Sequence, residues 1–199
     1  MNSAQHTDVV TIVSGLPRSG TSMMMKMLEA GGLVPVTDNI RTADEDNPKG
    51  YYELEKVKEM RTDSSWVSDT RGKVMKVISA LLQDLPADHR YRVVFMRREM
   101  AEVLASQRQM LIRRGQEPNK VPDEKMADMF EKHLVKIGAW LEAQPHIEVL
   151  YIKYNDILAE PAEAVRTLNA FFGDALDAGA MQSVVDRQLY RQRKVAGEG

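Results

Sequence analysis

The sequence predicts a single α/β domain, a three-layer sandwich with helices on both faces of a doubly wound parallel sheet. Short β-branched runs alternate along the chain with segments whose apolar residues recur at helical spacing. The first of these runs leads through a turn of small residues directly into a helical pattern. No internal repeat or linker divides the chain, and its length suits one core. We therefore expect one domain over residues 1–199.

The elements follow one another in a clear order. The expected strands are 9–13, 74–78, 91–96 and 147–152. Helical periodicity covers 23–30, 54–60, 99–114, 126–141, a helix that begins at 161, and 181–193. Gly31, Gly115 and Gly173 follow the ends of three of these helices. Pro161 suits a first helical position. Asp123 is expected to cap the helix at 126–141.

The turn after the first strand has the composition of a phosphate-binding loop. Small residues between Gly15 and Gly20 let backbone N–H groups close around an anion at a helix N-terminus. The glycine spacing fits a Walker A loop, but Thr21 stands where an ATPase or kinase has lysine. The cation lies inside the loop instead, as Arg18. The pattern predicts a P-loop-like nucleotide site, and an ordinary turn with capping hydroxyls is the alternative.

A second anion site is indicated after the strand at 91–96. Arg98 follows that strand, and Ser106 comes eight residues later on the next helix. A guanidinium at a strand end and a hydroxyl on the following helix can converge on one phosphate above the sheet edge. A solvated helix start is the alternative, because arginine and serine occur at such spacings in many chains. The order of the two motifs along the chain favours the anion site.

Both motifs resemble those of a known enzyme family. The loop resembles the 5′-phosphosulfate loop of sulfotransferases that use 3′-phosphoadenosine 5′-phosphosulfate (PAPS). Residues 98–106 resemble the family's 3′-phosphate motif, except at Met100, where many members have proline. Residues 149–158 are similar to a scaffold segment, in which we take Tyr154 and Asp156 as structural. The resemblance covers nearly the whole chain and implies transfer of a sulfuryl group from PAPS to a hydroxyl or amine of a small-molecule acceptor.

The resemblance also assigns chemical roles. Arg18 and Lys76 are expected to stabilise the charge that grows on the leaving phosphate, although a solvated strand-end lysine is the alternative for Lys76. An alcohol acceptor needs a base, but Ile78 stands where cytosolic members have their catalytic histidine. A carboxylate is then the default base. Glu53 is the first candidate and Asp38 the second, and the alternative for Glu53 is a helix cap.

The residues expected to bind PAPS come from three segments. The loop would hold the 5′-phosphate through N–H and hydroxyl groups, the second motif would hold the 3′-phosphate, and a basic C-terminal cluster would fold over the nucleotide. These residues are Arg18, Ser19, Gly20, Thr21, Ser22, Arg98, Ser106, Arg191 and Arg193. Arg187 and Lys194 belong to the same C-terminal cluster, for which a solvated face is the alternative.

Composition narrows the class of protein. The formal net charge is −2, so no general binding of nucleic acid is expected. Cysteine is absent, which excludes a thiolate nucleophile and favours a cytoplasmic location. The histidines are scattered, so we expect no metal site. No apolar run approaches the ~20 residues of a membrane span, and the first residues do not read as a signal peptide. The oligomeric state stays open.

Two other functions remain as alternatives. A P-loop kinase or NTPase shares the strand–loop–helix layout, but Thr21 and the lack of a clear Mg²⁺-binding aspartate at a strand end disfavour it. A catalytically inactive nucleotide-binding protein would keep both anion sites, and the missing histidine leaves this reading open.

Overall fold

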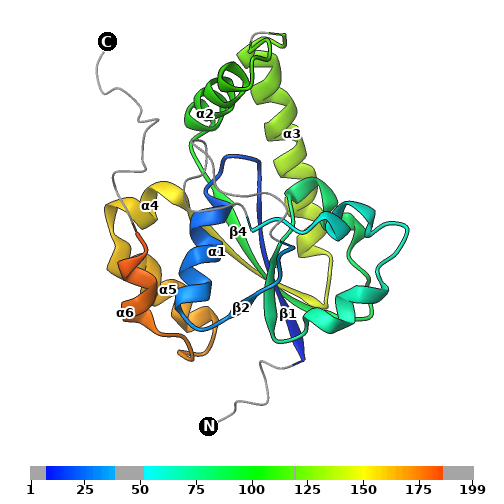
Figure 1. Ribbon diagram of the computed structural model, residues 1–199, viewed down its shortest axis with the longest axis vertical. Helices are drawn as coiled ribbons and strands as arrows, with labels where there is room; N and C mark the ends of the chain where they lie inside the picture. The colour runs from blue at the N-terminus through cyan, green and yellow to red at the C-terminus, as the bar shows by residue number, and fades with distance from the viewer. Residues whose placement is uncertain (1–7, 39–51, 119, 186–199) are drawn as a thin grey trace.

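A central parallel sheet organises the protein. The computed structural model describes residues 8–38, 52–118 and 120–185. The sheet has five strands in the order β2-β3-β1-β4-β5. They are β1 (Val9–Gly15), β2 (Val34–Pro35), β3 (Lys73–Lys76), β4 (Arg90–Arg97) and β5 (Ile147–Lys153). The loop after the central strand β1 thus opens at the carboxyl edge of the sheet, where such sheets bind ligands (Figure 1).

Helices cover both faces of the sheet, as the sequence predicts. The α-helices are α1 (Thr21–Ala30), α2 (Met100–Arg113), α3 (Asp123–Glu142), α4 (Tyr154–Ala159), α5 (Pro161–Phe171) and α6 (Ala178–Ser183). The 3-10 helices are η2 (Glu55–Glu59), η3 (Ser65–Thr70) and η4 (Ser79–Asp84). One core cluster joins α1, α4, α5 and α6 to the first face, and a second joins α3 and the 3-10 segments to the other.

The strands are buried for the reason that their sequences suggest. Every residue of β1 is buried, because a central strand of a parallel sheet has a covered layer on each side. Gly15 pairs in register with Met96, and Arg97 pairs with Lys153. The last residues of β1, β4 and β5 therefore end close together. Their side chains and the loop after β1 form the carboxyl edge of the sheet.

Two expected helices are wrong in detail. The segment 54–60 contains the short 3-10 helix η2 (Glu55–Glu59), and Leu54, Val57 and Met60 recur every three residues, which is the 3-10 period. Of the helix expected at 181–193, residues 181–183 belong to α6, which starts earlier and ends at Ser183. Residues beyond 185 lie outside the described part of the chain.

Two further details differ from the prediction. Asp123 is the first residue of α3 and not its cap, which is Pro122. The carboxylate of Asp123 instead pairs with Arg108 of α2 across the α2–α3 connection. Strand β2 was not predicted, because its two residues are too few for an alternating pattern to be visible.

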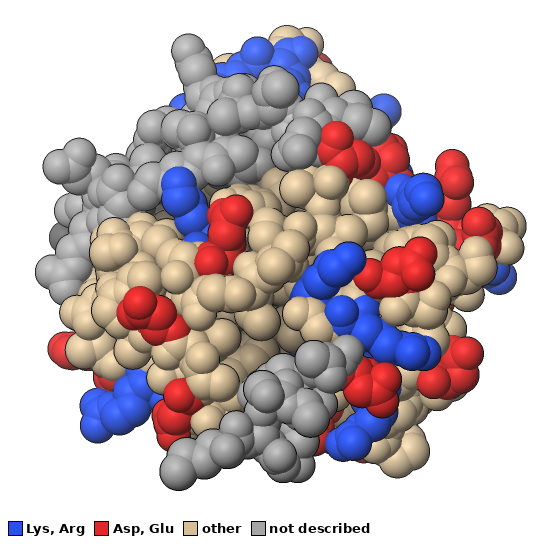
Figure 2. All heavy atoms as spheres, turned by 60° about the horizontal axis from the view of Figure 1, so that its bottom comes forward, with Lys and Arg blue, Asp and Glu red and all other residues tan. Residues whose placement is uncertain are grey.

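The α2–α3 pair rises above the carboxyl edge of the sheet (Figure 1). Only the first half of α2 is buried, at Glu102, Val103 and Ser106. Basic and acidic side chains lie interspersed on the face shown in Figure 2, so any strong attraction for an anion must be local. Among the described residues, no helix has the length and apolar character needed to cross a membrane.

Candidate active site

The loop between β1 and α1 has a backbone that only glycine permits at two positions. Gly15 has a φ of +146°, and a Cβ there would lie 2.5 Å from Ser19 Oγ and 2.6 Å from the Met96 carbonyl oxygen. Gly20 has a φ of +98°, and its Cβ would lie 2.4 Å from Cδ2 of Tyr154. The two glycines therefore fix the loop against β4 and α4.

Hydrogen bonds inside the loop complete its shape. The Ser19 hydroxyl donates to the Leu16 carbonyl at 2.7 Å, and the Ser19 amide donates to the same oxygen at 3.2 Å. The cap residue of α1 (Thr21–Ala30) is Gly20, which has no side chain to accept from the first amides of the helix. The partial positive charge of this helix end therefore faces the loop, as an anion site requires.

The two predicted anion sites meet at Arg18. Its backbone lies in the left-handed region, with a φ of +70°. Its Nε donates to Ser106 Oγ at 2.9 Å, although 88 residues separate the two in sequence. Its carbonyl oxygen accepts a hydrogen bond from Nη1 of Arg98 at 3.1 Å. Residues that the sequence assigns to two different phosphates are thus in direct contact.

Arg98 makes two further contacts, with Glu102 and with Tyr154. Its Nε donates to Oε2 of Glu102 at 2.9 Å, and this pair is almost fully buried, with side-chain exposures of 8% and 3%. Asn155 donates to both oxygens of Glu102, at 3.1 and 3.2 Å. The Arg98 guanidinium also stacks on the ring of Tyr154, 4.5 Å from its centroid. The ring of Tyr154 packs against Gly20 in turn.

Sequence reasoning missed Glu102 and Asn155 as members of this site. A signal for Glu102 was present, because opposite charges four residues apart at a helix start can pair. No comparable signal identifies Asn155, which lies at the start of α4 directly after β5 and reaches the site only through the parallel pairing of β4 with β5. Tyr154, taken as structural, does pack as a structural residue, and it does so inside the site.

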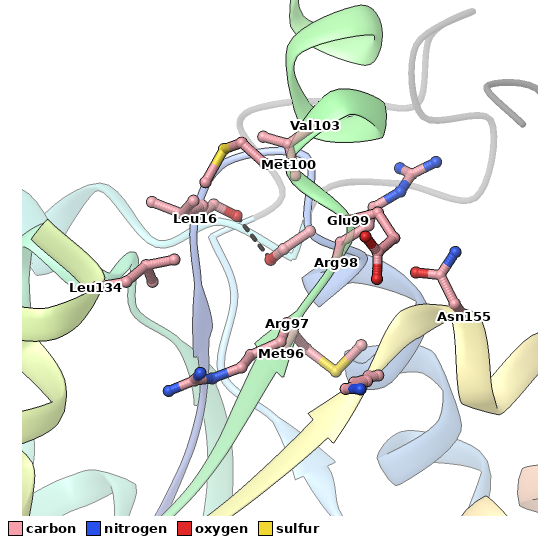
Figure 3. Close-up of a pocket in the computed structure, with 11 residues that line it drawn as sticks. Leu16, Met96, Arg97, Arg98, Glu99, Met100, Val103, Leu134 and Asn155 are labelled. Atoms are coloured by element: carbon pink, nitrogen blue, oxygen red, sulfur yellow. Dashed lines mark hydrogen bonds between the residues drawn. The ribbon is translucent and has the colours of Figure 1, made fainter. Parts of the chain in front are cut away.

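A cavity of about 200 Å³ opens beside this cluster (Figure 3). Ser19, Arg98 and Asn155 form part of its wall, and Arg97 and Lys153 contribute two more cations from the ends of β4 and β5. The apolar part of the wall is Leu16, Met96, Met100, Val103 and Leu134. The cavity therefore shares Ser19 and Arg98 with the predicted nucleotide site, and its wall also contains one acidic residue, Glu99.

Lys76 and Glu53 form a second ion pair near the loop. Lys76 ends β3 and is in register with Val13 of β1. Its Nζ lies 3.7 Å from Oε1 of Glu53, and the side-chain exposures are 7% for the lysine and 31% for the glutamate. Lys76 is therefore not the solvated strand-end lysine that the sequence allowed as an alternative.

Glu53 does not cap the helix that follows it. Leu54 occupies the cap position of η2, and the Glu55 amide donates to the Asp38 carboxylate at 2.6 Å. Capping therefore falls to Asp38, the second candidate base. The carboxylate of Glu53 is directed instead to Lys76.

Ile78, at the expected histidine position, is 41% exposed, and an imidazole does lie near it from another element. His133 of α3 makes a 2.8 Å hydrogen bond through Nε2 with Oγ of Ser79, the residue after Ile78. Burial, and then the charge of Lys136, hold the pKa of His133 below its usual value, so the ring is neutral near pH 7.

Other predicted features fall outside what the structure describes. Arg191 and Arg193, together with Arg187 and Lys194, lie beyond residue 185. Most of the acidic loop at 37–50 is likewise outside the described residues. Within the described ranges, no group of three or more histidine and acidic side chains is placed to hold a metal ion.

Comparison with known proteins defines the class. The model of the sulfotransferase domain family matches residues 8–195, so the chain belongs to the sulfotransferase family. It is a transferase whose reaction is sulfuryl transfer, and neither a kinase or NTPase nor an inactive binding protein is favoured. The family implies PAPS as the sulfuryl donor.

Solved structures agree with this fold. The chain is similar to the sulfotransferase domain from the Synechococcus PCC 7002 olefin synthase, with 14% identity, a TM-score of 0.52, and coverage of 94% of this chain and 82% of that one. It is also similar to the sulfotransferase domain from the curacin biosynthetic pathway, with 15% identity, a TM-score of 0.53, and coverage of 95% and 93%. No curated protein matches the sequence.

Proposed function

We propose that this chain transfers a sulfuryl group from PAPS to a hydroxyl or amine group of a small-molecule acceptor. The observation that carries the proposal is the contact between the two predicted anion sites. Arg18 Nε bonds Ser106, and Arg98 bonds the Arg18 carbonyl. A nucleotide with phosphate groups at both its 3′ and 5′ positions matches two adjoining cationic sites better than a nucleotide with one phosphate chain.

The residues of the loop suit the 5′-phosphate. Gly15 and Gly20 keep the backbone close, and the helix that starts at Thr21 adds its partial positive charge. Gly20, Thr21 and Ser22 would supply N–H and hydroxyl groups at this position. Ser19 would contribute by shaping the loop, because its amide and hydroxyl both donate to the Leu16 carbonyl. Arg98 and Ser106 would then face the 3′-phosphate. Because Glu102 already neutralises Arg98, we assign this guanidinium a double role, in shaping the loop and in binding phosphate.

Bound PAPS supplies a sulfuryl group whose bond to the 5′-phosphate breaks as the acceptor attacks sulfur. Arg18 and Lys76 are the side chains that we assign to the charge that develops on the phosphate. Preorganised cations in a site of low exposure stabilise such charge strongly, and Lys76 is only 7% exposed. The guanidinium of Arg18 is oriented beforehand by Ser106.

Glu53 is the base in this proposal. Its carboxylate is partly exposed, so an acceptor can approach it, and the 3.7 Å contact with Lys76 holds it beside the cation. A base must lie within hydrogen-bond reach of the proton that it removes. Glu53 is the carboxylate that the described ion pairs place beside Lys76. Asp38 is less suitable, because its carboxylate accepts the Glu55 amide.

Four parts of the proposal rest on the sequence alone. Arg191 and Arg193 would close over the nucleotide from the C-terminal side. The absence of cysteine favours a cytoplasmic location, and the net charge of −2 argues against nucleic acid as a partner. One domain over residues 1–199 completes the proposal.

The direct test is conversion of PAPS to the 3′,5′-bisphosphate in the presence of a metal chelator. We expect turnover that the chelator does not reduce, and a sulfated product by mass spectrometry when the protein is screened against alcohols, phenols and amines. Turnover of ATP but not of PAPS would overturn the proposal, as would a protein that neither binds the bisphosphate nor consumes PAPS.

A further inference from the structure

Tyr52, the residue directly before Glu53, has an unusual backbone. Its φ is +52°, in the left-handed region that residues with a bulky side chain rarely adopt. Local preferences therefore oppose this conformation, and contacts with the rest of the protein must hold it. The contacts are visible: the Tyr52 ring packs against the core cluster that includes α1, and its hydroxyl donates to the carboxylate of Glu29 on that helix.

The Tyr52–Glu29 contact persists across the working pH range. Burial raises the pKa of the Tyr52 phenol, and the hydrogen bond and charge of Glu29 raise it further. The hydroxyl therefore stays protonated and remains a donor. Tyr52 ties the chain entering Glu53 to α1, which begins at the predicted 5′-phosphate loop.

A second set of contacts holds Glu53 itself and the residues after it. The Glu53 carbonyl accepts hydrogen bonds from the Thr37 hydroxyl at 3.0 Å and from the Asp38 amide at 3.3 Å. The Asp38 carboxylate accepts the Glu55 amide at 2.6 Å. The backbone is thus fixed on both sides of Glu53, although the segment has neither strand nor α-helix structure.

We propose that Tyr52 and Asp38 are positioning residues that hold the Glu53 carboxylate beside Lys76. The proposal rests on the proposed role of Glu53 as the base. A displacement of about 1 Å at a reacting group can cost about 10²-fold in rate, so a side chain with 31% exposure needs a fixed backbone to act as a base. The left-handed conformation of Tyr52 orients the Glu53 carboxylate toward Lys76. The hydrogen bonds to Glu29 and Asp38 hold this orientation.

Tyr52→Phe tests the proposal, with Tyr91→Phe as its matched control. The ring of Tyr91 is buried and that of Tyr52 is partly buried, and the Tyr91 hydroxyl donates to the Pro86 carbonyl at 2.8 Å near the amino end of β4, away from the loop. Each variant loses one hydroxyl that donates one hydrogen bond. A general effect of lost stability should therefore appear in both variants, and an effect on Glu53 only in Tyr52→Phe.

The first measurement is amide hydrogen exchange of the unliganded protein. We expect faster exchange at the Asp38 and Glu55 amides in Tyr52→Phe and no change there in Tyr91→Phe, because both amides belong to the frame around Glu53. Glu29→Gln keeps an oxygen that accepts the phenol hydrogen, so the Asp38 and Glu55 amides of this variant should exchange as in the wild type. Unchanged protection in Tyr52→Phe, or equal loss in both tyrosine variants, would overturn the proposal.

The second measurement is PAPS turnover with water as the acceptor. We expect Tyr52→Phe to lower kcat about 10- to 100-fold while the affinity for the 3′,5′-bisphosphate is unchanged. In a Glu53→Gln background the same change should add nothing, because the group that it positions is already disabled. Equal effects in both backgrounds would contradict positioning. Full activity of Glu53→Gln alone would instead disprove the role of Glu53 as the base. The hydrogen-exchange experiment would still test whether Tyr52 holds the backbone around Glu53.

Discussion

Two ion pairs flank the loop after β1, and they differ in how tightly they are held. Arg98 and Glu102 are 2.9 Å apart, almost fully buried, and tied to Asn155. Lys76 and Glu53 are 3.7 Å apart, and the glutamate is 31% exposed. The first pair sits on the β4 side of the loop and the second on the β3 side.

The difference indicates that one ion pair shapes the loop and the other takes part in the reaction. A buried, fully hydrogen-bonded pair cannot move without exposing an uncompensated charge, so Arg98 and Glu102 suit the shaping of the loop. In a longer ion pair, an accessible carboxylate can leave its lysine partner and take a proton from the acceptor. Lys76 and Glu53 therefore suit the reaction. Changes on the β4 side should therefore affect stability and the affinity for the bisphosphate, and changes on the β3 side should affect turnover.

Glu53→Gln should have the largest effect on rate. A positioned base contributes about 10²–10⁴-fold, so turnover should fall by that order, while the denaturation midpoint and bisphosphate affinity stay close to those of the wild type. The pH–rate profile should also lose its acidic limb. A variant that loses stability but keeps its rate would mean that Glu53 is structural, and Asp38 would then be the next base to test.

Arg98→Ala should have the largest effect on stability. It leaves the buried Glu102 carboxylate without its charge partner, which typically costs about 3–5 kcal/mol. Chemical denaturation measures this directly. Lys132→Ala is the control, because it breaks an exposed pair with Asp128 and should cost only about 0.3–0.5 kcal/mol. Similar losses in both variants would contradict the structural role of the β4-side pair.

Arg18→Ala should lower turnover more than it lowers nucleotide affinity. Loss of one preorganised donor to developing charge typically costs about 10²–10³ in kcat. Arg18→Lys should retain part of the activity, because a point charge replaces some of the guanidinium's function. Steady-state kinetics together with calorimetry separate the two effects. Unaltered turnover in Arg18→Ala would mean that Lys76 alone neutralises the leaving phosphate.

The smallest expected effect concerns His133. Its pKa is lowered in the folded protein, so the unfolded chain binds the proton more strongly and stability should fall as the pH drops below about 6.5, the ordinary histidine value. His133→Gln should flatten the stability curve between pH 7 and pH 5 relative to the wild type, without changing turnover at pH 7. A slope that persists in the variant would assign the pH dependence to other groups.

Patterns local in sequence predicted most of the fold. The buried run of β1 and the glycines at 15 and 20 identified the strand, the loop and the start of α1, because their signals lie within a few residues. The family resemblance placed Arg98 and Ser106 in one site, and their contacts with Arg18 bring the two motifs together. The spacing of Leu54, Val57 and Met60 indicates a helix, and the structure has a 3-10 helix there.

Features that depend on distant contacts could not be predicted. Asn155 reaches Glu102 across 53 residues, and only the pairing of β4 with β5 brings them together. The left-handed backbone at Tyr52 accompanies a contact with Glu29 on α1, and no local pattern predicts either feature. Asp123 has a strong preference for a helix cap, yet an ion pair with Arg108 places it inside α3.

The central claim is that the loop and the β4-side cluster together bind a nucleotide with separate 3′ and 5′ phosphates. Titration calorimetry of the wild-type protein with 3′-phosphoadenosine 5′-phosphate, AMP and ADP, without added metal, tests it most directly. One additional charged hydrogen bond is worth about 1.5–3 kcal/mol, so the bisphosphate should bind at least about tenfold more tightly than AMP or ADP. Equal affinity for the three ligands, or a preference for ADP, would contradict the claim.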